Sequence, residues 1–156
     1  MTAPTDRVMD IVDAVAALLN APPTGFPAFV LGFQAQVAFQ PLFDLKELQT
    51  LQVTCVAAEE NDTMLLRQSS QLDVAVDVGV QKHMASVAEG RQLMALAYQF
   101  KTLLKLPAGL VFTFPDGSHA SWIGMTSRPL WHPDQMLHKN VFTRVLCFTY
   151  RTKIPR

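Results

Sequence analysis

Aliphatic residues alternate with small or polar residues through residues 71–82, which read QLDVAVDVGVQK. Successive side chains of a β-strand point to opposite faces. A strand here therefore gathers one apolar row on a single face: Leu72, Val74, Val76, Val78 and Val80. A helix would scatter these five side chains around its axis. The segment predicts a strand with one strongly apolar face and one face of small and polar groups.

Two other segments have helical periodicity. In residues 5–20, apolar residues recur at three- and four-residue spacing, and Thr5 or Asp6 is placed to cap the first turn. Residues 86–106 repeat this pattern directly after the strand, with Ser86 and Glu89 at the spacing of a capping box. Both segments predict amphipathic helices that pack against a sheet.

Further strands are predicted where aromatic and β-branched residues gather. Residues 29–40 and 50–58 have this composition, and residues 110–114 and 120–127 flank a PDGS turn as a hairpin. Residues 141–151 are apolar on both faces, which favours a central position in the sheet.

Two segments are expected to be irregular. Residues 59–70 (EENDTMLLRQSS) are too polar for a core strand and predict a connection, and residues 128–140 predict a loop. Residues 42–48 predict a short turn or a single helical turn. The simplest arrangement is one α+β domain over residues 1–156, with two amphipathic helices on one face of a mostly antiparallel sheet.

Charge is scarce in this chain. Of its 156 residues 17% are charged, against about 25% in a typical domain, and the net charge is zero. We interpret this as surface buried against other subunits; the alternative is a well-packed domain with uncharged polar loops. The absence of a basic excess argues against a general nucleic-acid binder. No apolar run reaches the roughly 20 residues that span a membrane, and the polar N-terminus is not expected to be a secretory signal.

The sequence lacks the spacing of common catalytic and metal sites. HExxH, CxxC, the P-loop and the GxSxG elbow are all missing, so we expect no catalytic residue, cofactor or metal ligand. Cys55 and Cys147 are expected to be free thiols in strands. A Ser-His-Asp set lies within one tight turn, whereas triads usually come from distant segments: Ser118, His119 and Asp116.

The strongest remaining chemical candidate is His132, with Asp134 and His138 nearby in the sequence. We interpret it as a surface loop with hydrogen-bonded histidines, and a pocket there is the alternative. Asp73 and Asp77 share one strand face but stand about 13 Å apart, too far to ligate one ion. They are expected to face solvent, a neighbouring subunit or a channel.

The order of segments resembles the tail terminator (tail-completion) proteins of long-tailed bacteriophages. The matching pieces are a short helix ending ALLN, then PLFDLKELQTLQVTCV, then VAVDVGVQK before the long helix. WIGMTSRPLWHPDQML and VFTRVLCFTYR complete the match, which covers nearly the whole chain.

This resemblance implies a structural virion protein, assembled in the host cytoplasm, that forms a homo-hexameric ring. The ring would cap the head-proximal end of the tail tube, end tube polymerisation and join the head connector or stopper protein. Genomic DNA would pass through the lumen without sequence-specific binding. Asp73 and Asp77 are hypothesised to line that lumen, because a strongly cationic wall would retain DNA.

Contacts with neighbours are expected in the two irregular segments, because extended loops often carry them. The residues proposed for these contacts combine charge with exposed apolar groups: Glu59, Glu60, Asp62, Met64, Leu65, Arg128 and Trp131. The alternatives are a head-completion (stopper) protein, another neck or tail component, an oligomeric adaptor unrelated to phage, or a small-ligand or metal enzyme domain with a pocket near His132.

Overall fold

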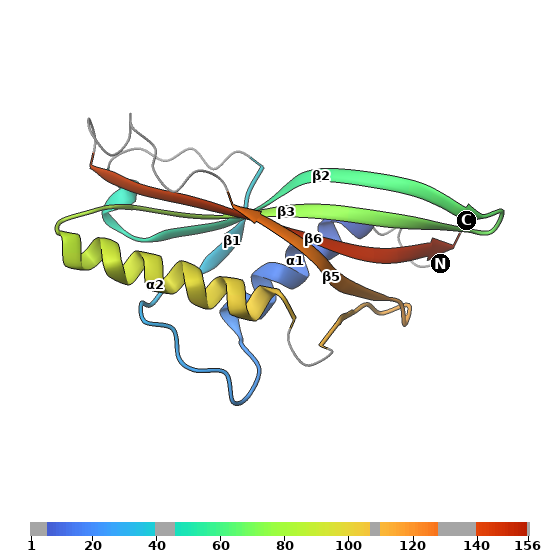
Figure 1. Cartoon of the computed structure of the whole chain (residues 1–156), viewed down its shortest axis with the longest axis horizontal. Helices are drawn as coiled ribbons and strands as arrows, with labels where there is room; N and C mark the ends of the chain where they lie inside the picture. Colours follow the sequence, from blue (N-terminus) through green and yellow to red (C-terminus); the bar gives the residue numbers. More distant parts are fainter. Residues whose placement is uncertain (1–5, 40–45, 107–109, 128–139, 156) are drawn as a thin grey trace.

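The sheet is built around two long antiparallel strands (Figure 1). The structure, a computed structural model, describes residues 6–39, 46–106, 110–127 and 140–155. β3 (Ser69–His83) and β6 (Val141–Pro155) pair along all 15 residues of each strand. On one face of β3 the valines at positions 74, 76, 78 and 80 are all 0% exposed. The strand predicted over residues 71–82 is therefore confirmed.

Four more strands complete a six-stranded sheet in the order β1-β2-β3-β6-β5-β4. They are β1 (Ala35–Val37), β2 (Gln52–Leu66), β4 (Phe112–Thr113) and β5 (His119–Ser127). β1 pairs with β2 in parallel, and the other pairings are antiparallel. β6 lies between β3 and β5, as its two apolar faces predicted. The predicted hairpin turn is also confirmed, with Gly117 in the left-handed region at φ +83°.

Both helices cover the same face of the sheet (Figure 1). α1 (Arg7–Asn20) and α2 (Val87–Leu104) contribute buried residues to one core cluster with the apolar rows of β3 and β6. Asp6 caps α1, and the Ser86 hydroxyl caps α2 by accepting a hydrogen bond from the Glu89 amide at 3.2 Å. The two caps and the α+β class were all predicted from the sequence, and all three predictions are confirmed.

The strand predicted over residues 29–40 is wrong except for the three residues of β1. Phe29 and Phe33 pack edge-on against Phe100 of α2 with ring centroids 5.5 and 5.0 Å away, instead of lying along a ladder. The Gln99 side chain accepts a hydrogen bond from the Val30 amide and donates one to the Ala28 carbonyl. A helix side chain thus satisfies backbone groups that a strand partner would otherwise bind.

The connection predicted over residues 59–70 is also wrong. β2 continues to Leu66 and pairs with β3 down to Ser69, so the segment forms the outer half of a long hairpin. We call residues 59–69 the arm. Its side chains are mostly exposed, and backbone pairing with β3 holds it without a core. Of the turn predicted over residues 42–48, the described part enters a short 3₁₀ helix, η1 (Glu47–Gln49).

Tyr150 of β6 ties the sheet to the last turn of α2. Its hydroxyl donates to the Leu104 carbonyl at 2.7 Å, and burial raises the pKa of this phenol well above its usual value. Tyr150→Phe removes that donor from a buried carbonyl, so we expect the free energy of unfolding to fall by about 1–3 kcal/mol. Urea denaturation measures this change.

Tyr98→Phe is the matched control, because the Tyr98 side chain is exposed on α2, the helix that accepts the Tyr150 hydrogen bond. It should leave stability within about 0.5 kcal/mol of the parent chain. Equal effects of the two substitutions would contradict the role assigned to the Tyr150 hydroxyl.

Candidate assembly surfaces

The arm carries five of the residues expected to contact partners. Glu60, Asp62 and Met64 pair with Val74, Leu72 and Ser70, so all three project from the face that elsewhere carries the core. Glu59 projects from the opposite face, opposite Ala75. At the tip Met64, Leu65 and Leu66 are 64%, 43% and 70% exposed. On the face of Glu60 and Asp62, the arm therefore presents two carboxylates followed by Met64.

Among the described residues, the outer edge of β2 is open along most of its length. β1 pairs only with Val53, Thr54 and Cys55, and the strand order places no other described strand beside β2 on that side. Open edges invite pairing with other chains, and charged side chains discourage it. This protection is one role for Glu59, Glu60 and Asp62, but it does not account for the exposed apolar tip.

The second face of the sheet is covered by neither helix and consists mainly of small or uncharged polar groups. Asp73 and Asp77 both lie on this face, as predicted. The Arg151 guanidinium donates two hydrogen bonds to the Asp73 carboxylate at 2.9 and 3.1 Å, and this contact raises the pKa of Arg151. Asp73 is thus neutralised locally rather than presented as a free charge.

A groove of about 400 Å³ lies between the first half of α2 and the start of β6. Apart from Arg91, its lining is apolar: Met84, Val87, Gly90, Met94 and Phe142. A Cβ at position 90 would come within 2.9 Å of the Met84 sulfur, so a larger residue there would require the Met84 side chain to shift. Val87 and Tyr98 extend the apolar surface along the outer face of α2, at 78% and 68% exposure.

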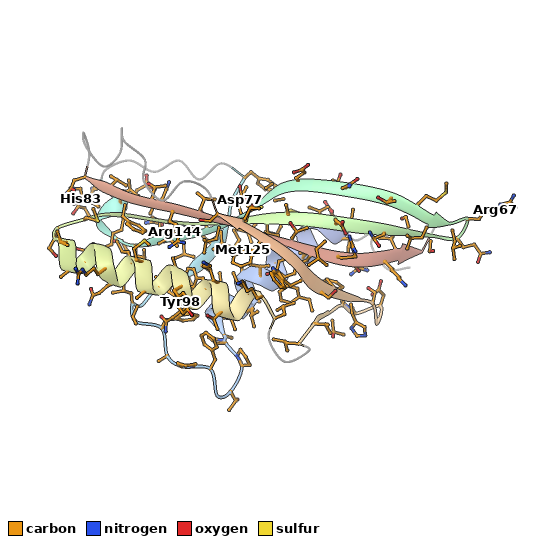
Figure 2. All side chains as sticks on the ribbon, in the orientation of Figure 1. Arg67, Asp77, His83, Tyr98, Met125 and Arg144 are labelled. Atoms are coloured by element: carbon orange, nitrogen blue, oxygen red, sulfur yellow. The ribbon has the colours of Figure 1, made fainter. Side chains whose placement is uncertain are left out.

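Arg144 projects from β6 towards α2 (Figure 2), and its contact with Met94 places it beside this groove. The residue is only 7% exposed, and its Nη1 approaches the Met94 sulfur at 3.5 Å. Within the described ranges its buried Nε has no hydrogen-bond partner. Burial lowers the pKa of this guanidinium. A buried cation is costly unless it is paired, so this Nε, which has no partner among the described residues, favours an incoming anion.

The PDGS turn does not assemble a catalytic triad. Asp116 accepts hydrogen bonds from the hydroxyl and the amide of Ser118, while the His119 ring contacts the Thr113 hydroxyl at 3.2 Å. The Ser118 hydroxyl bond is the main reason that the pKa of Asp116 is lowered, and Arg7 adds to it. This geometry stabilises a turn; a triad instead needs a serine hydrogen-bonded to a histidine.

Several predicted site residues lie outside the described residues. They are Arg128, Trp131, His132, Asp134 and His138. Among the residues that the structure does describe, no group of three or more metal-ligating side chains is close enough to hold a metal ion. In the same part of the chain, no helix has the length and apolar character needed to cross a bilayer.

Solved structures share the fold of this chain, but no protein family matches its sequence. No family model matches the sequence, and no curated protein matches it. Solved structures do match, among them a chain described as "Virion of native gene transfer agent (GTA) particle". The likeness has a TM-score of 0.50 at 14% sequence identity and covers 97% of this chain and 100% of that chain. The two chains share a fold over nearly their full lengths.

Replacement of Arg144 by an apolar residue of similar length tests the cost of the buried cation. Arg144→Met should raise the free energy of unfolding of the isolated chain by on the order of 1 kcal/mol, because a cation whose Nε has no partner among the described residues no longer has to be buried. Arg91→Met, at an exposed position on the same groove, should change stability by less than about 0.5 kcal/mol. Thermal unfolding of dilute protein compares the two, and a clear loss of stability in Arg144→Met would contradict the interpretation.

Proposed function

We propose that this chain is a structural virion protein of a phage-like particle and acts as a tail terminator. Copies of it would form a ring, with six copies expected, at the head-proximal end of the tail tube. The ring would end tube polymerisation and offer its other side to the head connector or stopper protein. The observation that carries this proposal is the shared fold with a chain of a gene transfer agent virion over 97% of its length.

The two faces of the sheet fit a ring subunit. The helices cover one face, and the other consists mainly of small and uncharged side chains. Of the charged residues on that face, Asp73 and Arg151 pair with each other, and Asp77 and Lys153 also lie on it. We propose that this second face lines the lumen. DNA phosphates would then slide past a wall that offers few free cations, since unpaired basic groups would bind the backbone.

A non-catalytic role agrees with the geometry of the described residues. Asp116, Ser118 and His119 form a turn, and the burial of Cys55, which raises its thiol pKa to about 12, makes it a poor nucleophile. Residues that contact partners rather than substrates then carry the function. The arm, with its open β2 edge, is the described surface best placed to meet a neighbouring chain.

The first experiment is a mass measurement in solution by light scattering, with negative-stain imaging of the same sample. Closed rings with a central hole wide enough for duplex DNA are the expected result. Purified tail tubes that stop growing, and then bind connector-bearing heads, after the protein is added would support the terminator role. Binding to heads without binding to tube ends would identify a stopper instead.

A cationic substitution tests whether the second face of the sheet lines the lumen. Thr149 lies on the uncovered face between Ala75 and Gly124, so Thr149→Lys would place an ammonium group in the DNA path. We expect rings to form normally while delivery of packaged DNA falls about tenfold or more, because phosphates bind the added cation.

Thr102→Lys, at an exposed position on α2, is the matched control and should leave DNA delivery unchanged. Normal delivery by particles that carry Thr149→Lys would show that this face does not line the lumen.

A further inference from the structure

We propose that the arm of one copy of this chain docks into the α2 groove of a second copy. The inference rests on the ring proposed above and names the two surfaces through which copies would join. Met64 would occupy the groove, and the acidic residues behind it would pair with the arginines around the groove. Three independent observations lead to this assignment.

The first observation is a match of apolar surfaces. Met64 is 64% exposed at the end of the arm, where nothing in the described structure covers it. The groove is apolar and offers about 400 Å³, within the range of pockets that bury a ligand (~300–1,000 Å³). Methionine is flexible and polarisable, and Met84 and Met94 in the groove wall share these properties, so the surfaces can adapt to each other.

The second observation is complementary charge. Glu60 and Asp62 share the face of Met64, and side chains two residues apart on a strand lie about 7 Å apart. Arg91 stands exposed on the groove wall, and Arg144 lies beneath Met94 with its Nε unpartnered in the described structure. A methionine seated in the groove therefore brings a carboxylate toward two cations. Pairing would relieve the cost of burying Arg144.

The third observation is the position of the two surfaces. Figure 2 places Arg67, at the tip of the arm, at one end of the long axis and His83, next to the groove, at the other. A chain cannot reach its own groove with its own arm. The contact must join different surfaces of different copies, and such a head-to-tail contact closes into a ring when the rotation between copies permits.

Reciprocal charge reversal tests the pairing on exposed residues, where folding is not at risk. Asp62→Arg and Arg91→Glu should each raise the dissociation constant for self-association about tenfold or more. The two substitutions combined in one chain should restore it to within about threefold of the parent value. Sedimentation over a range of concentrations measures all three, and Asp13→Arg on the outer face of α1 is the control.

Disulfide trapping tests the location directly. Met64→Cys and Val87→Cys chains, each in a Cys147→Ser background, are mixed and oxidised; Cys55 is buried and stays unreactive. A mixed dimer that joins positions 64 and 87 is expected, at a yield well above that of Met64→Cys mixed with Asp13→Cys. Equal yields, or a chain that stays monomeric at millimolar concentration, would overturn the proposal.

These outcomes separate this inference from the proposed function. If the dimers are trapped but the protein does not bind tail tubes, the contact between copies is supported and the terminator role is refuted. If the Asp62→Arg and Arg91→Glu proteins terminate tubes normally and their self-association is unchanged, the terminator role is supported and the proposed contact is refuted. Loss of tube binding on Asp62→Arg substitution, with self-association unchanged, would assign the arm to the tube protein and overturn the proposal.

Discussion

The pairing of β3 with β6 is the constraint on which the rest of the structure depends. Fifteen residues of each strand lie in register, so every side chain of one strand is fixed to the same face as its partner. The valine row of β3 thereby joins Leu146, Phe148 and Tyr150 into one continuous apolar surface. Both helices must cover this surface, and the opposite face is left to small polar groups.

Segments whose own side chains determine their partners could be predicted from the sequence. The strict alternation in β3 fits only a strand, and the capped periodic segments fit only amphipathic helices. The structure confirms these three elements. The conformation of residues 29–34 could not be predicted, because the Val30 amide and the adjacent Ala28 carbonyl bind Gln99, a residue about 70 positions away. Phe29 and Phe33 alternate as in a strand, yet they serve as packing partners for Phe100.

The strand structure of the arm could not be predicted for a different reason. Its polarity excluded a core strand, but a strand needs backbone partners rather than burial, and β3 supplies them. The expectation that Met64 and its neighbours are exposed was nevertheless sound. The groove could not be foreseen, because it joins residues 84–94 to Phe142 across the fold. Two signals for it were present: Arg144 interrupts an apolar row, and Val87, Met94 and Tyr98 recur at helical spacing outside the buried stripe.

A single unpaired residue in β2 controls the chemistry of the arm. Ala57 pairs with Val76 and Glu59 with Ala75, so Ala58 is bulged out of the ladder. A regular ladder through Ala58 would shift the phase by one and exchange the two faces of the arm. Glu60, Asp62 and Met64 would then project from the face of Asp73 and Asp77, while Val53 and Cys55 stayed in the core. One residue gained or lost at this point could therefore give related chains an inverted arm on an unchanged core.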